Sequence, residues 1–387
     1  MWMGLNMNKS FLFALPLLLI ILIGSSDSRK MVNHDLSIQS LDDFNLSLPE
    51  GFKIELFASG LGTPRQMTET DDGYIIVGTI KEGDIYALKD TDGNGQADYS
   101  KKILSSLEQP SGIAFNNGSV FFSEISKISK IIDIDSKLNN QEQSFEAEVV
   151  NVIDNLPEDT WHGRKWLKFG ADGGLYFNIG APCNVCLNDD DRYATILKFI
   201  DGEYSVYARG VRNSVGFDFH PQTNKLFFTD NGRDWLGDDS PSCELNVANQ
   251  AEQFFGFPYH HGKDVQDPEF GNINHGYEII KPIFELGPHV APTGADFYSG
   301  NMFPDSYKNN LFVTLHGSWN RSQKSGYKVV RIIFDADDQP QMQDFLVGFL
   351  KGEEVLGRPS SPFEMSDGSL LISDDKLGNI YRISYEG

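Results

Sequence analysis

Basic residues, cysteines and long apolar runs are all scarce in this chain of 387 residues. Lysine and arginine together number 32 against 55 aspartate and glutamate residues, so the formal net charge is −23. This balance argues against nucleic acid or an anionic membrane surface as a partner. No stretch shows a helical period over a useful length, so we expect a fold built of strands.

The chain has three cysteines, and two of them form a C-x-x-C pair at Cys183 and Cys186. A zinc site would need a second Cys or His pair at similar spacing, and none accompanies this one. The pair therefore predicts a small disulfide, which fits a compartment outside the cytoplasm. Cys243 is left over, and we expect it to be a buried thiol.

The N-terminus carries an apolar run over residues 11–23, preceded by Lys9 and followed by the small residues 24–26. This is the pattern of an export signal, and an uncleaved anchor would have the same pattern. We expect residues 1–30 to be a signal peptide or N-terminal anchor, 31–47 a linker and 48–387 one domain. The protein is then extracytoplasmic, periplasmic or secreted, and a membrane is a partner only if the segment stays uncleaved.

Aromatic residues and glycines are plentiful, with 28 Phe, 14 Tyr and 37 Gly, enough for a large core with many turns. A turn followed by an apolar run occurs six times, at residues 71–79, 116–124, 171–179, 222–230, 307–315 and 366–374. Each copy has another short strand pattern before it, and most have a third strand pattern after it. Six copies of an antiparallel unit predict an all-β fold, a six-bladed β-propeller.

Two segments fall outside the regular repeat. The segment FKIELFASG (52–60) has strand character and no copy of its own, so we expect it to close the ring as the outer strand of the last blade. The interval between the fourth and fifth copies is the longest. Residues 231–300 are therefore expected to carry an insertion that forms long loops near the site and no separate domain.

Polar residues recur at one position of the repeat, seven residues before the last apolar position of the first strand. They are Glu108, His162, Arg212 and Arg358. In blade four, Asn213 follows Arg212, and the run 230–234 follows the next strand, so both segments lie at one end of an antiparallel pair. A ring of His and Arg costs free energy to desolvate unless it binds a ligand or pairs internally. We interpret the ring as a binding site for a ligand.

The motifs HGRKWLKFG (162–170), IGAPCNVC (179–186), YARGVRNSVGFDFHP (207–221), FTDNGRDWLGDD (228–239) and HGSWNRS (316–322), in this order, resemble the glucose/sorbosone dehydrogenases, most closely the L-sorbosone dehydrogenase branch. The resemblance covers nearly all of residues 48–387. It implies a six-bladed quinoprotein that holds pyrroloquinoline quinone (PQQ) and Ca²⁺. Such an enzyme oxidises a sugar or aldehyde at its anomeric or aldehydic carbon and passes electrons to a quinone or cytochrome.

The resemblance also implies roles for individual residues. His162 matches the catalytic base, and Arg212 matches the arginine that stabilises the reduced quinone. The residues matched to cofactor binding are Arg212, Asn213, His316, Arg321 and Arg358. Gly232 and Arg233 match the positions whose backbone carbonyls coordinate calcium.

The chain departs from the family pattern at three of these positions. Soluble glucose dehydrogenases have an acid beside the base where this chain has Ala181, which leaves Asn184 and Asp189 as candidates to orient His162. Arg233 replaces a proline and is expected to add charge near the metal. A lysine of the glucose enzymes aligns near His316. These differences make a substrate other than glucose the expectation.

Residues 90–98 match the first nine positions of a calcium-binding loop, with oxygen-bearing side chains at Asp90, Asp92, Asn94 and Asp98. Position twelve is Lys101, so the bidentate glutamate is missing. A weak structural calcium site and a plain Asp/Gly turn are both compatible with the pattern.

Two other functions fit a propeller of this composition. One is a calcium-dependent hydrolase of the lactonase type, which would direct several carboxylates at the metal. The other is a non-catalytic ligand-binding propeller, which would not need His162 and Arg212 in register. Trp235 and Trp319 are expected to be buried, the commoner outcome for aromatic side chains, although either is also suited to stacking on a sugar or a planar cofactor.

Overall fold

The computed structural model describes residues 46–140, 145–335, 337 and 339–387. The predicted signal segment 1–30 lies outside the described residues, as does nearly all of the predicted linker. Strands dominate the described part, with one short helix, α1 (Ile134–Asn139), and one 3-10 turn, η2 (Asp305–Tyr307). Among the described residues no helix has the length and hydropathy needed to cross a membrane.

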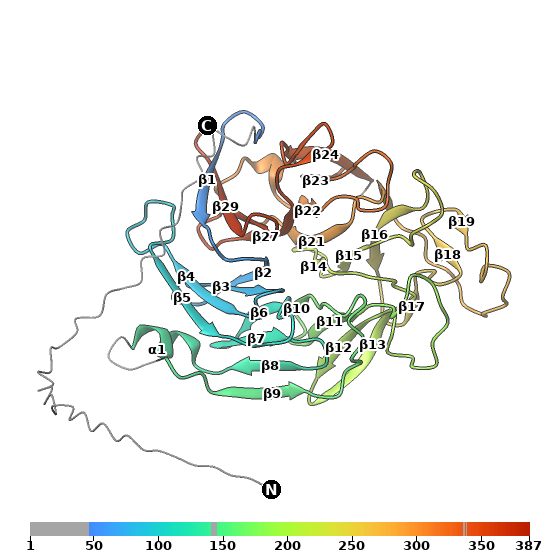
Figure 1. The fold of residues 1–387 in the computed structure, drawn as a ribbon, viewed down its shortest axis with the longest axis horizontal. Coiled ribbons are helices and arrows are strands. Elements are labelled where there is room, and N and C mark those ends of the chain that lie inside the picture. The colour runs from blue at the N-terminus through green and yellow to red at the C-terminus, as the bar shows by residue number, and fades with distance from the viewer. Residues whose placement is uncertain (1–45, 141–144, 336, 338) are drawn as a thin grey trace, which may run out of the picture. The chain divides into compact units, whose positions relative to one another are not determined.

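Six sheets of four or five strands surround a central axis, and the first four strands of each are antiparallel, which confirms the six-bladed β-propeller (Figure 1). The innermost strands of blades one to six are β2 (Pro64–Glu69), β6 (Ile113–Asn116), β10 (Leu167–Phe169), β14 (Phe217–Phe219), β21 (Pro292–Phe297) and β27 (Pro359–Glu364). The second strands are β3 (Ile75–Thr79), β7 (Ser119–Ser123), β11 (Leu175–Ile179), β15 (Leu226–Asp230), β22 (Leu311–Leu315) and β28 (Leu370–Asp374). These second strands coincide with the six repeats of the sequence.

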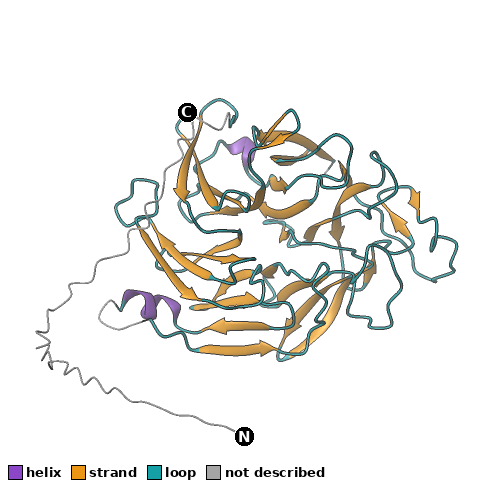
Figure 2. Ribbon diagram, in the orientation of Figure 1, coloured by secondary structure: helices purple, strands orange, loops and turns teal. Residues whose placement is uncertain are grey.

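The two outer positions of each sheet complete the blades (Figure 2). The third strands are β4 (Ile85–Lys89), β8 (Ile128–Ile131), β12 (Thr195–Ile200), β16 (Ser242–Ala248), β23 (Lys328–Phe334) and β29 (Asn379–Tyr385). The fourth strands are β5 (Tyr99–Leu104), β9 (Val149–Ile153), β13 (Glu203–Arg209), β20 (Phe284–Pro288), β24 (Pro340–Leu346) and β1 (Phe52–Ala58). As predicted, β1 closes the ring from the N-terminal side by pairing with β29.

The second strands form because each is an apolar run that is covered on both faces. All five residues of β3, for example, are buried, and the same holds for β11, β15, β22 and β28. The buried apolar residues form six clusters, each between two neighbouring blades. The core is therefore a ring of blade interfaces around a polar axis.

Residues 231–300 differ from the prediction in one respect, because they do not form loops throughout. Part of it supplies β16 and β20, the outer strands of blade four. The remainder forms loops, the short strand β17 (Gln253–Phe254) that extends blade three, and the hairpin of β18 (His260–His261) and β19 (Val265–Gln266). No separate domain is formed within the described residues, as predicted.

Buried ion pairs join three blades at the C-terminal ends of their innermost strands. The ammonium group of Lys168 lies 2.8 Å from a carboxylate oxygen of Asp218 and 3.0 Å from one of Asp296. Both carboxylates are buried, and burial raises the pKa of Asp296 to about 7. This end of the axis is held together by charge, and the opposite end of the strands opens into a cavity.

Candidate active site

A cavity of about 380 Å³ lies where the innermost strands begin and the second strands end. All six blades contribute to its wall, through residues such as Gln66, Ser111, Trp166, Thr293 and Ser360. The charged and imidazole side chains in the wall are Arg65, His162, Arg164, Lys165, Arg212, Asp234, His289, His316 and Arg358. Four arginines and one lysine against one carboxylate favour an anionic ligand in this cavity, in a chain whose net charge is −23.

His162 and Arg212 are connected through one backbone residue. The Nδ1 of His162 donates to the carbonyl oxygen of Ala181 at 2.8 Å, and the N–H of Ala181 donates to the carbonyl oxygen of Arg212 at 2.8 Å. A carbonyl oxygen only accepts, so the Nδ1 carries the proton and the Nε2 keeps its lone pair. The expectation that Asn184 or Asp189 orients the imidazole is therefore wrong, because a backbone carbonyl at Ala181 does so.

Gly180 allows this close approach. A Cβ at this position would lie 2.5 Å from the Cβ of His162 and 2.7 Å from its carbonyl oxygen. His162 itself has φ of 54°, in the left-handed region that costs a residue with a side chain about 1 kcal/mol or more. The backbone at His162 is thus held in an unusual conformation by its packing against the end of β11.

The imidazole of His162 is neutral at physiological pH. Burial and the neighbouring guanidinium of Arg212 lower its pKa to about 3, and Arg164 adds to the effect. A neutral imidazole with a free Nε2 lone pair can accept a proton from a hydroxyl group.

The guanidinium of Arg212 is buried and is held mainly by oxygens that carry no formal charge. Its Nε donates to the carbonyl oxygen of Asn184 at 2.8 Å, and its two terminal nitrogens donate to the Oδ1 of Asn184 at 2.9 Å and to the carbonyl oxygen of Asn231 at 3.1 Å. One carboxylate oxygen of Asp234 lies 3.4 Å away. The charge of Arg212 is therefore only partly compensated and remains available to a ligand.

Asn184 links Arg212 to the loop that follows β15. Besides its two bonds to Arg212, its side chain accepts the backbone N–H of Asp234 at 2.8 Å and donates to the carbonyl oxygen of Asp234 at 3.1 Å. Asn184 lies between Cys183 and Cys186, which form the predicted disulfide, and Cys243 is the predicted buried thiol. The disulfide closes a small loop around the residue that positions Arg212.

Two buried polar atoms in the cavity wall have no hydrogen-bond partner within the described residues. They are the Oδ1 of Asn213 and the Nε of Arg65. The backbone of Asn213 is fixed by Asp230, whose carboxylate accepts the N–H of Arg212 at 2.7 Å and that of Asn213 at 2.6 Å. Buried polar groups are normally satisfied, so these two atoms indicate that a polar ligand completes the site.

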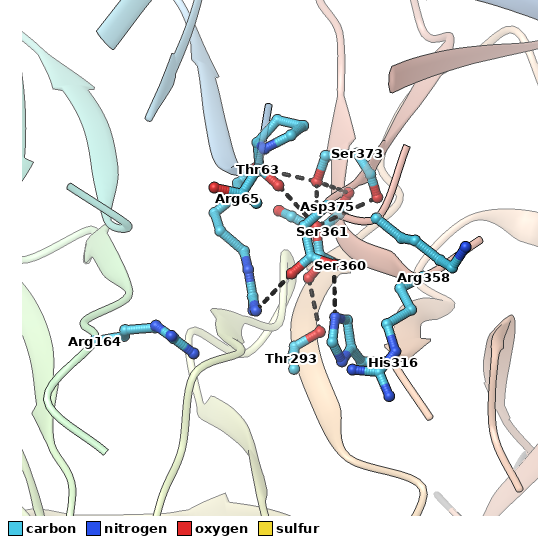
Figure 3. A network of polar contacts seen from close by, with 12 residues as sticks. Thr63, Arg65, Arg164, Thr293, His316, Arg358, Ser360, Ser361, Ser373 and Asp375 are labelled. Carbon is cyan, nitrogen blue, oxygen red and sulfur yellow. Dashed lines mark hydrogen bonds and ion pairs between the residues drawn. The ribbon is translucent and has the colours of Figure 1, made fainter. Parts of the chain in front are cut away.

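Blades one, five and six meet at a second group of charges in the same wall. The carboxylate of Asp375 accepts from the Nε2 of His316 at 2.8 Å and lies 2.7 Å from a guanidinium nitrogen of Arg65, as Figure 3 shows. The guanidinium of Arg358 donates to the hydroxyl oxygen of Tyr327 at 3.2 Å and has no carboxylate partner within the described residues. Of the sequence-predicted residues, His316 and Arg358 thus lie in the cavity with His162, Arg212, Asn213 and Gly232.

Two predicted residues lie elsewhere. Arg321 is not in the wall of this cavity, because its guanidinium is held by the carbonyl oxygens of Asp238 at 3.0 Å and Gln323 at 2.6 Å. The side chain of Arg233 also lies outside the wall and pairs with the buried carboxylate of Asp267. Arg233 therefore adds no uncompensated charge at the predicted metal position, contrary to the expectation.

The loop 90–98 has the geometry of the plain turn. Asp90 accepts the backbone N–H groups of Gly93 and Gly95, and Asp98 accepts those of Thr91, so the side chains satisfy the loop's own backbone. Within the described residues, no group of three or more His, Cys, Asp or Glu side chains converges as a metal site. The calcium interpretation of Asp90, Asp92, Asn94 and Asp98 is not supported by this geometry.

Sequence reasoning missed several residues of the site. Arg164 belongs to the wall, and so does Lys165, whose pKa burial lowers to about 7. Trp319 lies in the wall with 64% of its surface exposed and is in edge-to-face contact with Trp235, which is 68% exposed. The two tryptophans are exposed where burial was expected.

Comparison with known proteins identifies relatives of this chain. A family profile described as TrAA12-like matches residues 274–385. An uncharacterized protein of Borreliella burgdorferi is 36% identical over 353 residues, which covers 88% of this chain and 91% of that protein. A pyrroloquinoline quinone-dependent pyranose dehydrogenase of Coprinopsis cinerea is 23% identical over 333 residues, and the match spans 74% of this chain but only 44% of that protein.

Solved structures share the fold. The holo form of the PQQ domain of the Coprinopsis cinerea pyranose dehydrogenase superposes with a TM-score of 0.72 at 19% identity, covering 88% of this chain and 97% of that domain. The calcium structure of the Trichoderma reesei family AA12 enzyme gives a TM-score of 0.72 at 18% identity, with the same coverage of each chain.

Proposed function

The chain belongs to one family with the Borreliella burgdorferi protein and is distantly similar to PQQ-dependent sugar dehydrogenases, and from this we propose that it is a PQQ- and calcium-dependent dehydrogenase of a sugar or related aldehyde. The observation that carries the proposal is that His162 and Arg212 are both bonded to Ala181 in one cation-lined cavity. The L-sorbosone branch and the extracytoplasmic location remain predictions from the sequence.

The residues present fit PQQ, which is a planar tricarboxylate. The cavity is rich in cations, and the unpartnered Oδ1 of Asn213 and Nε of Arg65 offer an acceptor and a donor to a polar heterocycle. Arg358, Arg65 and His316 lie where they would meet carboxylates, for which the guanidinium fork is suited. When bound, PQQ supplies a two-electron oxidant and Ca²⁺ a Lewis acid.

The calcium ion would be held by the backbone carbonyls of Gly232 and Arg233. Gly232 lies in the cavity wall, and a Cβ there would come within 3.1 Å of the Ser242 carbonyl oxygen, so the backbone runs close to its neighbours. Since no three acidic or imidazole side chains converge among the described residues, a metal here depends on carbonyl oxygens and on the ligand's own oxygens. The lactonase alternative, which needs several carboxylates at the metal, gains no support from this donor set.

In the proposed reaction, His162 would accept the proton of the substrate hydroxyl at its Nε2. The hydride on the carbon that bears this hydroxyl would be taken up by the two-electron oxidant that PQQ supplies. Its Nδ1–H, held by the Ala181 carbonyl, fixes the ring and the tautomer. Arg212 places a permanent positive charge beside the ligand, where it stabilises the negative charge that develops on reduction. Asn213 orients the ligand through its amide.

The test is reconstitution of the purified chain with PQQ and Ca²⁺, followed by dye reduction with a panel of aldoses and aldehydes. Turnover should require both additions. The His162→Gln variant should lose at least about a hundredfold in kcat, because general-base catalysis contributes that much, while it still binds PQQ. Turnover without PQQ, or loss of PQQ binding in His162→Gln with the fold intact, would contradict the proposal.

A further inference from the structure

A second open cavity, of about 450 Å³, lies beside the first. The two share Trp319 and Arg358, so a ligand in the first cavity would be adjacent to the second. The residues that line it are Ser318, Trp319, Arg321, Ser322, Lys324, Tyr327, Glu353, Val355, Arg358 and Lys376. We define these residues as the outer pocket.

The outer pocket is positively charged in a strongly acidic chain. It contains four cations and one carboxylate, whereas the whole chain has 32 basic against 55 acidic residues. Lys324 lies 3.6 Å from that carboxylate, which belongs to Glu353, and Arg321 pairs with the exposed Asp239 at 3.1 Å. These pairs leave Arg358 and Lys376 with no carboxylate partner among the described residues.

Lys376 is exposed, and its ammonium group has no hydrogen bond or ion pair with a described residue. Arg358 is half-buried, and its guanidinium lies over the ring of Tyr327, 5.4 Å from the ring centroid, without a direct ion pair among the described residues. In the proposed complex Arg358 would face a carboxylate of the cofactor, so Lys376 is the cation with which an anionic group in the outer pocket would pair. The pocket is thus arranged for an anionic group.

The aromatic residues of the pocket point to the rest of the ligand. Trp319 is 64% exposed, and its edge-to-face contact with Trp235 at 5.7 Å holds the two rings in a fixed arrangement. An exposed indole offers an apolar face to the C–H surface of a sugar ring, and the exposed hydroxyl of Ser322 offers a hydrogen bond. Cations beside such a face favour a saccharide that carries an acidic group.

We propose that the outer pocket is the subsite for the acidic group of the substrate, so that the enzyme prefers saccharides bearing a carboxylate or phosphate over neutral sugars. The inference rests on the proposed function, since the ring being oxidised would occupy the neighbouring cavity. Arg358 and Trp319 border both cavities and would contact the ligand at the junction.

The first experiment compares kcat/KM of the PQQ- and calcium-loaded enzyme on matched sugars: D-glucose, D-glucuronate, D-glucose 6-phosphate, D-galactose and digalacturonate. The acidic sugars should exceed the neutral ones by about tenfold at low ionic strength, and 0.5 M NaCl should reduce that advantage because exposed charges are screened. A larger gain for the uronates identifies a carboxylate as the preferred acidic group, and a larger gain for glucose 6-phosphate identifies a phosphate. Equal values for acidic and neutral sugars would overturn the inference.

Lys376→Gln tests the pocket itself. It should lower the ratio of acidic to neutral kcat/KM by about three- to fivefold, the usual scale of an exposed ion pair. Lys53→Gln is the matched control, because Lys53 is an exposed lysine on the outer strand β1 and should leave the ratio unchanged. A ratio that is the same in Lys376→Gln and in the parent protein would overturn the inference.

A binding measurement separates this inference from the proposed function. Titration of D-glucuronate should quench tryptophan fluorescence, and D-glucose should bind with a higher dissociation constant. Lys376→Gln should raise the dissociation constant of D-glucuronate by about three- to fivefold. If this holds while no sugar is oxidised, the outer pocket stands and the proposed oxidation fails. If neutral sugars are oxidised but glucuronate binds no better than glucose, the outer pocket fails alone.

Discussion

A methyl group added at Gly180 would lie 2.5 Å from the Cβ of His162 and 2.7 Å from its carbonyl oxygen. Ordinary carbon contacts begin at 3.4 Å, so the Gly180→Ala variant must move His162 away from the end of β11 by about 1 Å. The same hypothetical Cβ lies 3.3 Å from the carbonyl oxygen of Arg212, so the strain falls on the backbone that joins the two residues.

The expected cost is larger for catalysis than for folding. A misplacement of about 1 Å at a catalytic group lowers turnover by roughly a hundredfold. Overpacking by one methyl group costs about 1–3 kcal/mol of the free energy of unfolding, which a closed propeller of this size should tolerate. We therefore expect Gly180→Ala to fold, to bind PQQ more weakly and to lose most of its kcat.

The assay is PQQ-dependent dye reduction per folded molecule, with the melting temperature measured in parallel. Gly118→Ala is the control, because Gly118 has φ of 71° and an open surrounding, so it loses stability through backbone strain at a turn between β6 and β7. That variant should lower the melting temperature with kcat unchanged. A folded Gly180→Ala with the parent kcat would refute the reasoning that this glycine positions His162.

Three further predictions concern single residues. Asn184→Ala removes the side-chain bonds to Arg212 and to the loop after β15, so calorimetry should show PQQ affinity lowered by about tenfold or more. His162→Asn should flatten the pH dependence of the free energy of unfolding. The native pKa of His162, near 3, lies below the unfolded value of 6.5, so the imidazole makes the protein less stable as the pH falls from 6.5 towards 3. The variant should reduce that slope by up to about 1.4 kcal/mol per pH unit. Lys168→Met leaves two buried carboxylates unpaired, and denaturant titration should show a loss of about 2–4 kcal/mol.

The fold was predictable from sequence because each blade repeats the same local signal. A turn with Gly or Asn followed by a buried apolar run predicted all six second strands, each of which ends at the last residue of its repeat or one residue before it. The strand segment without a copy of its own was correctly placed as the closing strand β1. The turn glycines have positive φ, for instance 77° at Gly173, which explains why the turn residues are so regular.

The site was only partly predictable. The register of His162, Arg212 and Arg358 follows from their distance to the strands, and the structure places these three in the wall of one cavity. Glu108 has the same register but does not line the cavity. Their partners did not follow, because a backbone carbonyl such as that of Ala181 has no signature in a residue type. Asn184 carried a visible amide, but its contact with Arg212 joins two loops 28 residues apart.

Charge pairing explains the remaining differences. Arg65 pairs with Asp375 across the closure of the ring, a separation that no local pattern reveals. Arg233 looked like an added charge at the predicted calcium position, yet Asp267 of the following insertion compensates it, and the Nε2 of His261 lies 2.9 Å from the same carboxylate. In each case, an aspartate from a loop distant in the sequence compensates the charge of the arginine.

The central claim is that six blades form one cavity for PQQ and Ca²⁺ beside His162 and Arg212. Isothermal titration of PQQ into the purified chain, with and without Ca²⁺, tests it most directly. We predict one PQQ bound per chain, dependence on Ca²⁺, and at least about a tenfold loss of affinity in Arg212→Gln, since a charged hydrogen-bonding partner is removed. Absence of binding in the presence of Ca²⁺, or binding that Arg212→Gln leaves unchanged, would contradict the claim.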